Sequence, residues 1–289
     1  MSYDKSNSLF VNLCIGGLSG IFSRTVAAPV DLYKMQLQTP FLPNSNLKYV
    51  IQHEGVFGLW KGNGINCFRI FPQTGIHFVG NNMCLQSVRS VGIVPNTKHY
   101  ILAGTLGGIA GSFFTYPLET IRTRFSLQTD RNQYYNVRDA IKKISIGDCY
   151  RGVSMHLLGH VPFNALTFTF FHKYKQYISY YDKSKFISDR STHFICGGLS
   201  GLSAVVFTYP SDIIRRRLQL QGFSEHVPKC TSVRDCIHTI YQKEGMYGYY
   251  RGLHAGMIRM FIAMSVQFTM FRELKNQIKI KKQLAYENN

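Results

Sequence analysis

The chain has 289 residues, of which 45% are hydrophobic, and its 33 lysines and arginines against 15 acidic residues give a net charge of +18. On a soluble protein such a charge suggests nucleic-acid binding. However, the sequence has no zinc-finger spacing, and its basic residues are dispersed among long apolar stretches. A basic helical nucleic-acid-binding protein is therefore kept as the alternative of another class. The mean hydropathy of -0.08 and the lack of a strictly apolar run of eighteen residues exclude a simple hydrophobic span.

Six segments have about the length of a membrane-crossing helix and are rich in Gly, Ala, Phe, Leu and Ile, with polar residues on one side. They run approximately from Leu9 to Gln36, Asn63 to Val88, Tyr100 to Leu127, Ser154 to Ile178, Thr192 to Gln221 and His254 to Ile278. Charges within a membrane line a cavity or pair with each other. The segments therefore predict a transport protein with lipid outside and water inside, and a large soluble helical core is the alternative.

One six-residue motif recurs in the first, third and fifth segments, at intervals of roughly 90 residues, as expected for an internal repeat. The copies are Pro29-Val30-Asp31-Leu32-Tyr33-Lys34, Pro117-Leu118-Glu119-Thr120-Ile121-Arg122 and Pro210-Ser211-Asp212-Ile213-Ile214-Arg215. The repeats span residues 9–92, 98–181 and 190–280 of a single domain, 1–289. Each proline falls inside its predicted helix, where it removes a backbone hydrogen bond.

Two further features recur with the same period. Pairs of glycines precede each proline, and small residues four apart let helix backbones approach closely. These are Gly16 and Gly20, Gly104 and Gly108, and Gly197 and Gly201. A triplet of an aromatic, a base and a glycine follows each proline: Trp60-Lys61-Gly62, Tyr150-Arg151-Gly152 and Tyr250-Arg251-Gly252. Glu-Gly precedes the first and third triplets, whereas the second repeat has Ile144-Ser145.

The seven cysteines have no CxxC motif or regular framework, which predicts reduced core residues and no metal or redox site. They are Cys14, Cys67, Cys84, Cys149, Cys196, Cys230 and Cys236. Residues Met1 to Phe10 lack the apolar region of a signal peptide and an Arg-rich presequence. We therefore expect internal targeting information.

From about Leu9 to Ile278 the chain resembles the mitochondrial carriers. Their signature, P-x-[DE]-x-x-[KR] followed by [DE]-G-x-x-x-x-[WYF]-[KR]-G, is intact in repeats one and three and half intact in repeat two. The resemblance implies an all-α membrane protein with six tilted transmembrane helices in three pseudo-threefold repeats and short helices on the matrix side. It also implies a monomer of the inner membrane of a mitochondrion or related organelle.

An acid and a base three residues apart share one helix face, so three such pairs at one depth could close a ring; ordinary surface pairs are the alternative. By resemblance, a matrix gate would pair Asp31 with Arg122, Glu119 with Arg215, and Asp212 with Lys34. The resemblance also makes Gln36 a bracing residue, with Arg124 and Arg217 in the other two brace positions.

On the opposite side the family usually carries [FY]-[DE]-x-x-[KR], and the acid is absent from all three copies here. The corresponding residues are Asn81, Asn82 and Leu85, then Phe171, His172 and Lys175, and then Phe271, Arg272 and Lys275. We therefore expect no salt-bridge ring on the cytoplasmic side and a resting preference for the cytoplasm-open state. His172 is either a titrating group near physiological pH or a plain surface histidine.

The family's substrate contact points fall seven residues past each triplet glycine, at Arg69, Gly159 and Arg259, with His160 beside the second. Guanidinium groups bind phosphate oxygens bidentately, so two arginines at this depth favour a large phosphate-bearing anion. Completing an internal ion-pair network is the alternative. Gly159 would leave room for a flat purine, and Phe163 would either stack on it or pack in the bundle.

Arg24, in Ser23-Arg24-Thr25, resembles a position of the ADP/ATP, ATP-Mg/phosphate and coenzyme A carriers. His160 departs from the aliphatic residue common in nucleotide carriers, and Leu218-Gln219-Leu220 replaces the methionine triplet of ADP/ATP exchangers. The resemblance thus favours a broader carrier of purine nucleotides or a nucleotide-containing cofactor such as coenzyme A, working by exchange. Another phosphorylated cofactor, such as thiamine pyrophosphate, is the alternative within transport.

An aromatic beside a base and a helix N-terminus can hold an anionic lipid head group. By resemblance the three triplets would bind cardiolipin; simple interfacial anchoring is the alternative. No catalytic constellation is present in the sequence, so we expect a transporter without enzymatic activity, cofactor or metal.

Overall fold

The structure is a computed structural model that describes residues 2–43, 46–128, 133–181 and 189–287. Within these ranges it is helical and has no strand. The first repeat contains α1 (Ser2–Gln38), α2 (Leu47–Glu54), the 3-10 turn η1 (Val56–Trp60) and α3 (Asn63–Ser90). The second contains α4 (Thr97–Leu127), α5 (Val137–Lys143), α6 (Ile146–Cys149) and α7 (Val153–Tyr181). The third contains α8 (Asp189–Gln219), α9 (Val233–Glu244), the 3-10 turn η2 (Met246–Tyr250) and α10 (Leu253–Glu287).

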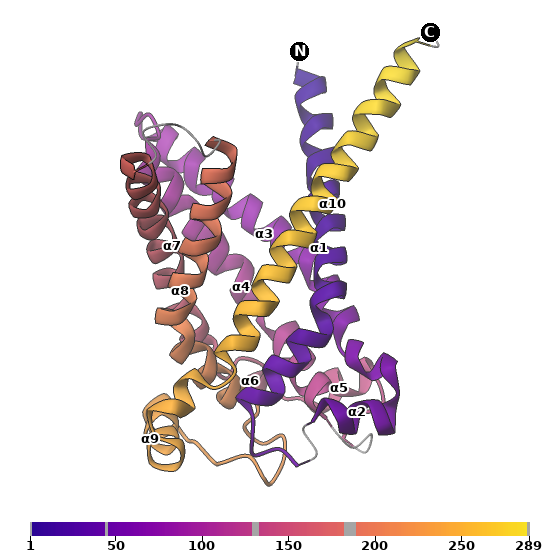
Figure 1. The fold of residues 1–289 in the computed structure, drawn as a ribbon, viewed down its shortest axis with the longest axis vertical. Coiled ribbons are helices and arrows are strands. Elements are labelled where there is room, and N and C mark those ends of the chain that lie inside the picture. The colour runs from indigo at the N-terminus through magenta and orange to yellow at the C-terminus, as the bar shows by residue number, and fades with distance from the viewer. Residues whose placement is uncertain (1, 44–45, 129–132, 182–188, 288–289) are drawn as a thin grey trace.

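Six long helices of the described chain stand side by side, and the short helices gather at one end of the bundle, here called the short-helix end (Figure 1). The other end, where α1 begins and α10 ends, is called the open end. The most extensive helix contacts join α3 to α4, α7 to α8, and α1 to α10. Each of these contacts joins one repeat to the next, so the three repeats close into a ring.

Glycines produce the closest helix approach between the first two repeats. A Cβ added at Gly107 would lie 2.6 Å from the His77 carbonyl oxygen, and one at Gly111 would lie 2.9 Å from that of Gln73. By contrast, a Cβ at Gly104 would have open space around it, as would one at Gly16 or Gly197. The first glycine of each predicted pair therefore does not mediate close helix packing, and between α3 and α4 the neighbouring pair takes that role.

The triplet glycines make the sharp turns into α3, α7 and α10. Gly62, Gly152 and Gly252 have φ of 79°, 83° and 80°, a conformation that strongly favours glycine. A Cβ at Gly62 would also lie 2.2 Å from Ser126 Oγ, near the end of α4. The recurrence of this glycine thus has a structural reason, because a side chain here would strain the turn and clash with the next repeat.

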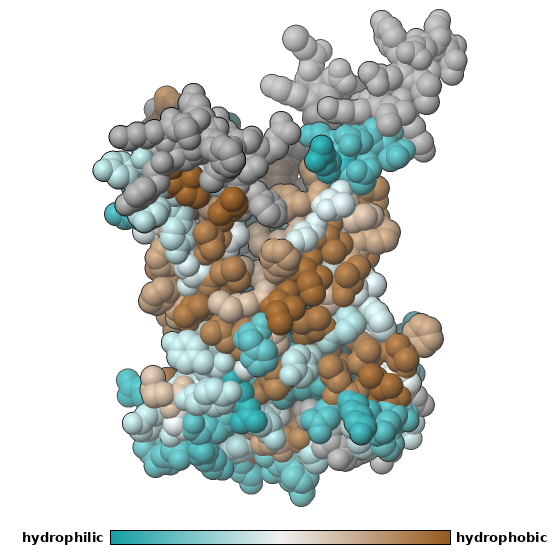
Figure 2. All heavy atoms as spheres, in the orientation of Figure 1, coloured by the Kyte–Doolittle hydropathy of each residue, from teal (hydrophilic) through white to brown (hydrophobic). Residues whose placement is uncertain are grey.

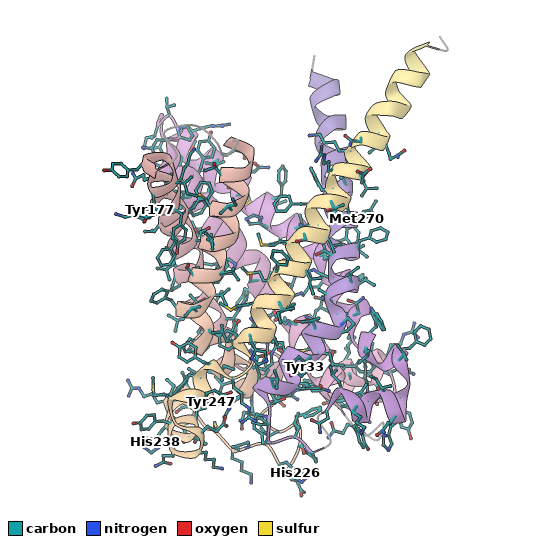
Figure 3. All side chains as sticks on the ribbon, in the orientation of Figure 1. Tyr33, Tyr177, His226, His238, Tyr247 and Met270 are labelled. Carbon is teal, nitrogen blue, oxygen red and sulfur yellow. The ribbon has the colours of Figure 1, made fainter. Side chains whose placement is uncertain are left out.

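The outer surface of the bundle is apolar along its middle. In Figure 2 hydrophobic residues cover the central part of the long helices, and hydrophilic residues gather at the short-helix end. Phe68, Phe114, Phe207 and Phe261 project from four different helices and are each at least 64% exposed. Among the described helices one segment, His99–Leu127, is both long and apolar enough to cross a membrane by composition alone. Figure 3 shows Tyr247 and His238 at the short-helix end, with Met270 and Tyr177 toward the open end.

Candidate functional site

A chamber of about 540 Å³ lies inside the bundle, where the helices that carry the repeated motif converge. We call it the cationic chamber, because many charged side chains line it. Its basic residues are Arg24, Lys34, Arg69, Arg122, Arg215, Arg216 and Arg259, and its acidic residues are Asp31, Glu119 and Asp212. Four positive charges therefore have no carboxylate to balance them within the chamber.

The repeated motifs place three ion pairs across the base of this chamber. Arg122 Nη2 of α4 pairs with Asp31 Oδ2 of α1, and Arg215 Nη2 of α8 pairs with Glu119 Oε1 of α4. Lys34 Nζ of α1 lies 3.4 Å from Asp212 Oδ2 of α8. These are the pairings expected from the resemblance, and each one links two different repeats. Their role as a gate stays a prediction.

Two of the acids accept a second basic partner. Arg69 Nη1 of α3 lies 2.6 Å from Glu119 Oε2, and Arg259 Nε of α10 lies 3.2 Å from Asp31 Oδ1. The alternative interpretation of these arginines, an internal ion-pair network, is thus the arrangement found in the structure. Because each shares its acid with another base, a phosphate that took either arginine would leave that acid with one partner.

Among the described residues, two basic side chains of the chamber have only uncharged hydrogen-bond partners. Arg24 Nη1 donates to the backbone carbonyl and to the side-chain Oδ1 of Asn66, both at 3.0 Å. Arg216 Nη1 donates to Thr123 Oγ1 at 2.5 Å and to Gln219 Oε1 at 3.0 Å. Sequence reasoning included Arg24 and missed Arg216, although Arg216 directly follows the motif base Arg215.

The bracing role of Gln36 stays a prediction. Its buried Oε1 accepts no hydrogen bond from any residue that the structure describes, and residues two apart on a helix do not face each other. Gln38, four residues past Lys34, instead donates from Nε2 to the Tyr209 hydroxyl at 3.1 Å.

The other two brace positions connect to the short-helix end. Arg124 donates to the backbone carbonyls of Gln219 and Gln221 at 2.9 and 2.8 Å. Arg217 Nη2 lies 2.7 Å from Glu244 Oε1, at the end of α9. These two arginines therefore hold neighbouring segments together, and their partners within the described ranges lie outside the three motif pairs.

A second cavity of about 600 Å³ lies between α3, α4 and α7 and shares Arg24 and Thr74 with the cationic chamber. We call it the side lobe. Its lining consists of Arg24, Gln73, Thr74, His77, Tyr100, Ile101, Gly104, Thr105, Gly108, Ser112, His160, Asn164 and Phe168. Arg24 is the one permanently charged residue of this lining. Sequence reasoning placed only Arg24 and His160 of this set at a site.

The room expected at Gly159 is not present in this structure. A Cβ there would lie 2.3 Å from Ser211 Oγ of α8, so Gly159 serves helix packing. Phe163 lines neither the cationic chamber nor the side lobe. His160, one residue past Gly159, does line the side lobe, where its Nδ1 lies 3.2 Å from Asn164 Nδ2.

The residues expected at a degenerate cytoplasmic gate lie on α3, α7 and α10 toward the open end. His172, Lys175, Arg272 and Lys275 are exposed, and Asn82 is half-buried. Lys175, Arg272 and Lys275 among them are basic.

The bases of the three triplets each pair with a nearby acid. Lys61 Nζ lies 2.5 Å from Glu54 Oε1, Arg151 Nε lies 2.9 Å from Asp148 Oδ1, and Arg251 Nη1 lies 3.6 Å from Glu244 Oε2. Asp148 thus supplies the acid that the second repeat lacks at Ile144-Ser145.

Within each repeat, the triplet also connects the first long helix to the start of the second. Trp60 Nε1 donates to the Thr25 carbonyl at 2.8 Å. The hydroxyls of Tyr116 and Tyr209, each just before a motif proline, donate to the carbonyls of Arg151 and Arg251 at 3.1 Å. The Tyr150 ring stacks on that of Tyr116, with centroids 6.3 Å apart. The aromatic, base and glycine therefore have structural roles that do not depend on lipid.

Comparison with known proteins places this architecture in a family. The family model described as mitochondrial carrier protein matches residues 5–91, 95–182 and 189–282. An uncharacterized mitochondrial carrier of Saccharomyces cerevisiae is 30% identical over 91% of this chain and 91% of its own length. Solute carrier family 25 member 16 of Mus musculus is 30% identical over 90% of this chain and 86% of its own length.

A third relative, the mitochondrial adenyl nucleotide antiporter of Mus musculus, is 26% identical over 95% of this chain, which spans 59% of that relative's length. Members of the matched family are multi-pass transporters of the mitochondrial inner membrane. With three consecutive family matches over most of its length, the chain belongs to the mitochondrial carrier family.

Proposed function

We propose that this protein exchanges a purine nucleotide, or a cofactor that contains one, across the mitochondrial inner membrane. The observation that carries the proposal is the charge of the cationic chamber, where seven basic side chains face three carboxylates. A polyanion such as ATP, ADP or coenzyme A would neutralise the excess. The relative that aligns with 95% of this chain is named as an adenyl nucleotide antiporter. Its name agrees with this substrate class.

Transport would proceed through a bundle of six membrane-spanning helices that opens the central site to one side of the membrane at a time. It would require no covalent step. In the unliganded state the three motif pairs would keep the short-helix end, facing the matrix, closed. Substrate phosphates would compete with Glu119 and Asp31 for Arg69 and Arg259, which contact them at 2.6 and 3.2 Å. A ligand shifts such an equilibrium only through its different affinity for the two states. Tighter substrate binding in the state between the two open conformations would therefore offset the free energy lost when the ion pairs break.

The thermal stability of the detergent-purified protein tests this proposal. A ligand at one hundred times its Kd stabilises the folded protein by about 2.7 kcal/mol. We expect stabilisation by ATP, ADP or coenzyme A, and its loss in Arg69→Gln and Arg259→Gln. Arg138→Gln is the control, because Arg138 is an exposed base on α5, outside the chamber.

The other outcomes separate the alternatives. Stabilisation by thiamine pyrophosphate alone would move the substrate to the second class of phosphorylated cofactor. Stabilisation only by carboxylates or amino acids would contradict nucleotide transport and leave the carrier fold intact.

We also propose that the protein works as a monomer and binds cardiolipin at the triplets. The backbone N–H groups that begin α3, α7 and α10 follow Gly62, Gly152 and Gly252, and helix N-termini attract phosphate. Because the triplet bases pair with Glu54, Asp148 and Glu244, the amides would supply most of the contacts. Delipidated protein should then regain thermal stability with cardiolipin and not with phosphatidylcholine.

A further inference from the structure

The side lobe differs in chemistry from the cationic chamber that it joins. Apart from Arg24, its polar groups are amides, hydroxyls and imidazoles, and no carboxylate is among the residues that line it. Tyr100 and Phe168 add aromatic rings. Such a lining suits a flat, uncharged heterocycle and gives a polyphosphate little to bind.

The geometry points to the side lobe as the binding site for the purine base of the substrate, with the phosphates in the cationic chamber. This inference rests on the proposed function and assigns the base to a place other than Gly159 and Phe163. Arg24 and Thr74 line both cavities. A nucleotide that spans these two residues would therefore place its base in the side lobe and its phosphates in the cationic chamber.

Three features of the lobe support a planar base. Gly104 of α4 lines it, and a Cβ there would meet no atom within 4 Å, so this wall offers bare backbone to a ring. Asn164 of α7 is held through Nδ2 by His160 Nδ1 at 3.2 Å, which leaves its carbonyl oxygen for a base amino group. His77 Nε2 is held at 3.1 Å from the Gly104 carbonyl and narrows the lobe from the α3 side.

Leucine at position 104 would extend into the lobe from a Cβ that has no atom within 4 Å. Gly197 is the matched control, since it is the equivalent glycine of the third repeat and also has open space around it. Gly197 lines an apolar groove between α8 and α10 that shares no lining residue with the side lobe or the cationic chamber. Gly104→Leu and Gly197→Leu therefore add the same side chain, and only the first adds it to the side lobe.

Isothermal titration calorimetry of the full-length protein in detergent, with ATP, UTP and inorganic tripolyphosphate, tests the assignment. Wild-type protein should bind ATP more tightly than UTP. In Gly104→Leu the Kd for ATP should rise at least about tenfold, equivalent to about 1.4 kcal/mol, while that for tripolyphosphate changes less than about twofold. Gly197→Leu should leave both values unchanged.

Asn164→Leu is the second variant, of similar size and without the amide. Loss of one hydrogen bond predicts a Kd for ATP about three to tenfold higher, with tripolyphosphate unaffected. Equal weakening of ATP and tripolyphosphate in both variants, or unchanged ATP binding, would overturn the base assignment and leave the proposed function standing. If wild-type protein bound none of the three ligands, the base assignment would fail, and the proposed function would fail as well if coenzyme A did not bind.

Discussion

Removing the charge of Glu119 should destabilise the unliganded protein more than removing the charge of the half-exposed motif acid Asp212. Glu119 is 9% exposed and pairs with both Arg69 and Arg215. Asp212 is 46% exposed and has one basic partner, Lys34, at 3.4 Å among the described ion pairs. Glu119→Gln keeps the shape of the side chain but leaves two guanidinium groups without their carboxylate.

The expected magnitudes follow from this difference in burial. Breaking a buried pair costs about 3–5 kcal/mol, and we take about 3 kcal/mol for Glu119 because it borders the chamber. A half-exposed pair contributes about 0–1 kcal/mol, which applies to Asp212→Asn. At about 2–4 °C per kcal/mol, Glu119→Gln should lower Tm by about 6–12 °C and Asp212→Asn by about 0–4 °C.

The assay is thermal unfolding of each purified variant without ligand. Glu225→Gln is the matched control, since Glu225 is exposed in the segment before α9 and lies outside the chamber; its Tm should equal that of the wild type. Equal losses for Glu119→Gln and Asp212→Asn, or no loss for Glu119→Gln, would refute the doubly paired arrangement.

Three further predictions concern the short-helix end. Gly62→Ala should lower stability by about 1–3 kcal/mol more than Gly55→Ala, because both residues have positive φ but only Gly62 has a close neighbour, Ser126 Oγ; unfolding midpoints that agree would contradict this. Burial raises the pKa of the Cys236 thiol to about 12, so its reactive thiolate should be scarce at pH 8 and increase only as pH approaches that value; mass spectrometry after maleimide treatment at pH 8 should show the half-buried Cys84 modified before the buried Cys236. Ser232→Ala should cost about 0.5–2 kcal/mol, since Ser232 Oγ accepts from the Asp235 amide at 3.2 Å and caps α9; Ser224→Ala, in the preceding loop, should leave Tm unchanged.

The repeats made part of this molecule predictable. A motif copied three times can meet itself around a threefold ring, and the resemblance to the mitochondrial carriers indicated which acid would pair with which base. The six long helices contain most of the six segments that length and composition had indicated. The functional meaning of those pairs is still a prediction that needs experiment.

Other features depended on distances that a sequence does not contain. The positions of Arg69 and Arg259 indicated the chamber, but their sharing of Glu119 and Asp31 with other bases depends on how α3 and α10 pack. Gly159 was interpreted as open space because a glycine lacks a side chain, whereas the approach of Ser211 from α8 fills that space. For the brace, helix geometry argues against a contact between Gln36 and Lys34, since residues two apart on a helix do not face each other.

The central claim is that the four uncompensated positive charges of the cationic chamber select a phosphate-bearing nucleotide. The most direct measurement is exchange by purified protein in liposomes loaded with ATP, with radiolabelled ATP, coenzyme A, malate and lysine offered outside. The account predicts uptake of ATP or coenzyme A that requires internal substrate, is abolished in Arg69→Gln and Arg259→Gln, and persists in Arg138→Gln. Uptake of malate or lysine without any uptake of nucleotide or coenzyme A would contradict it.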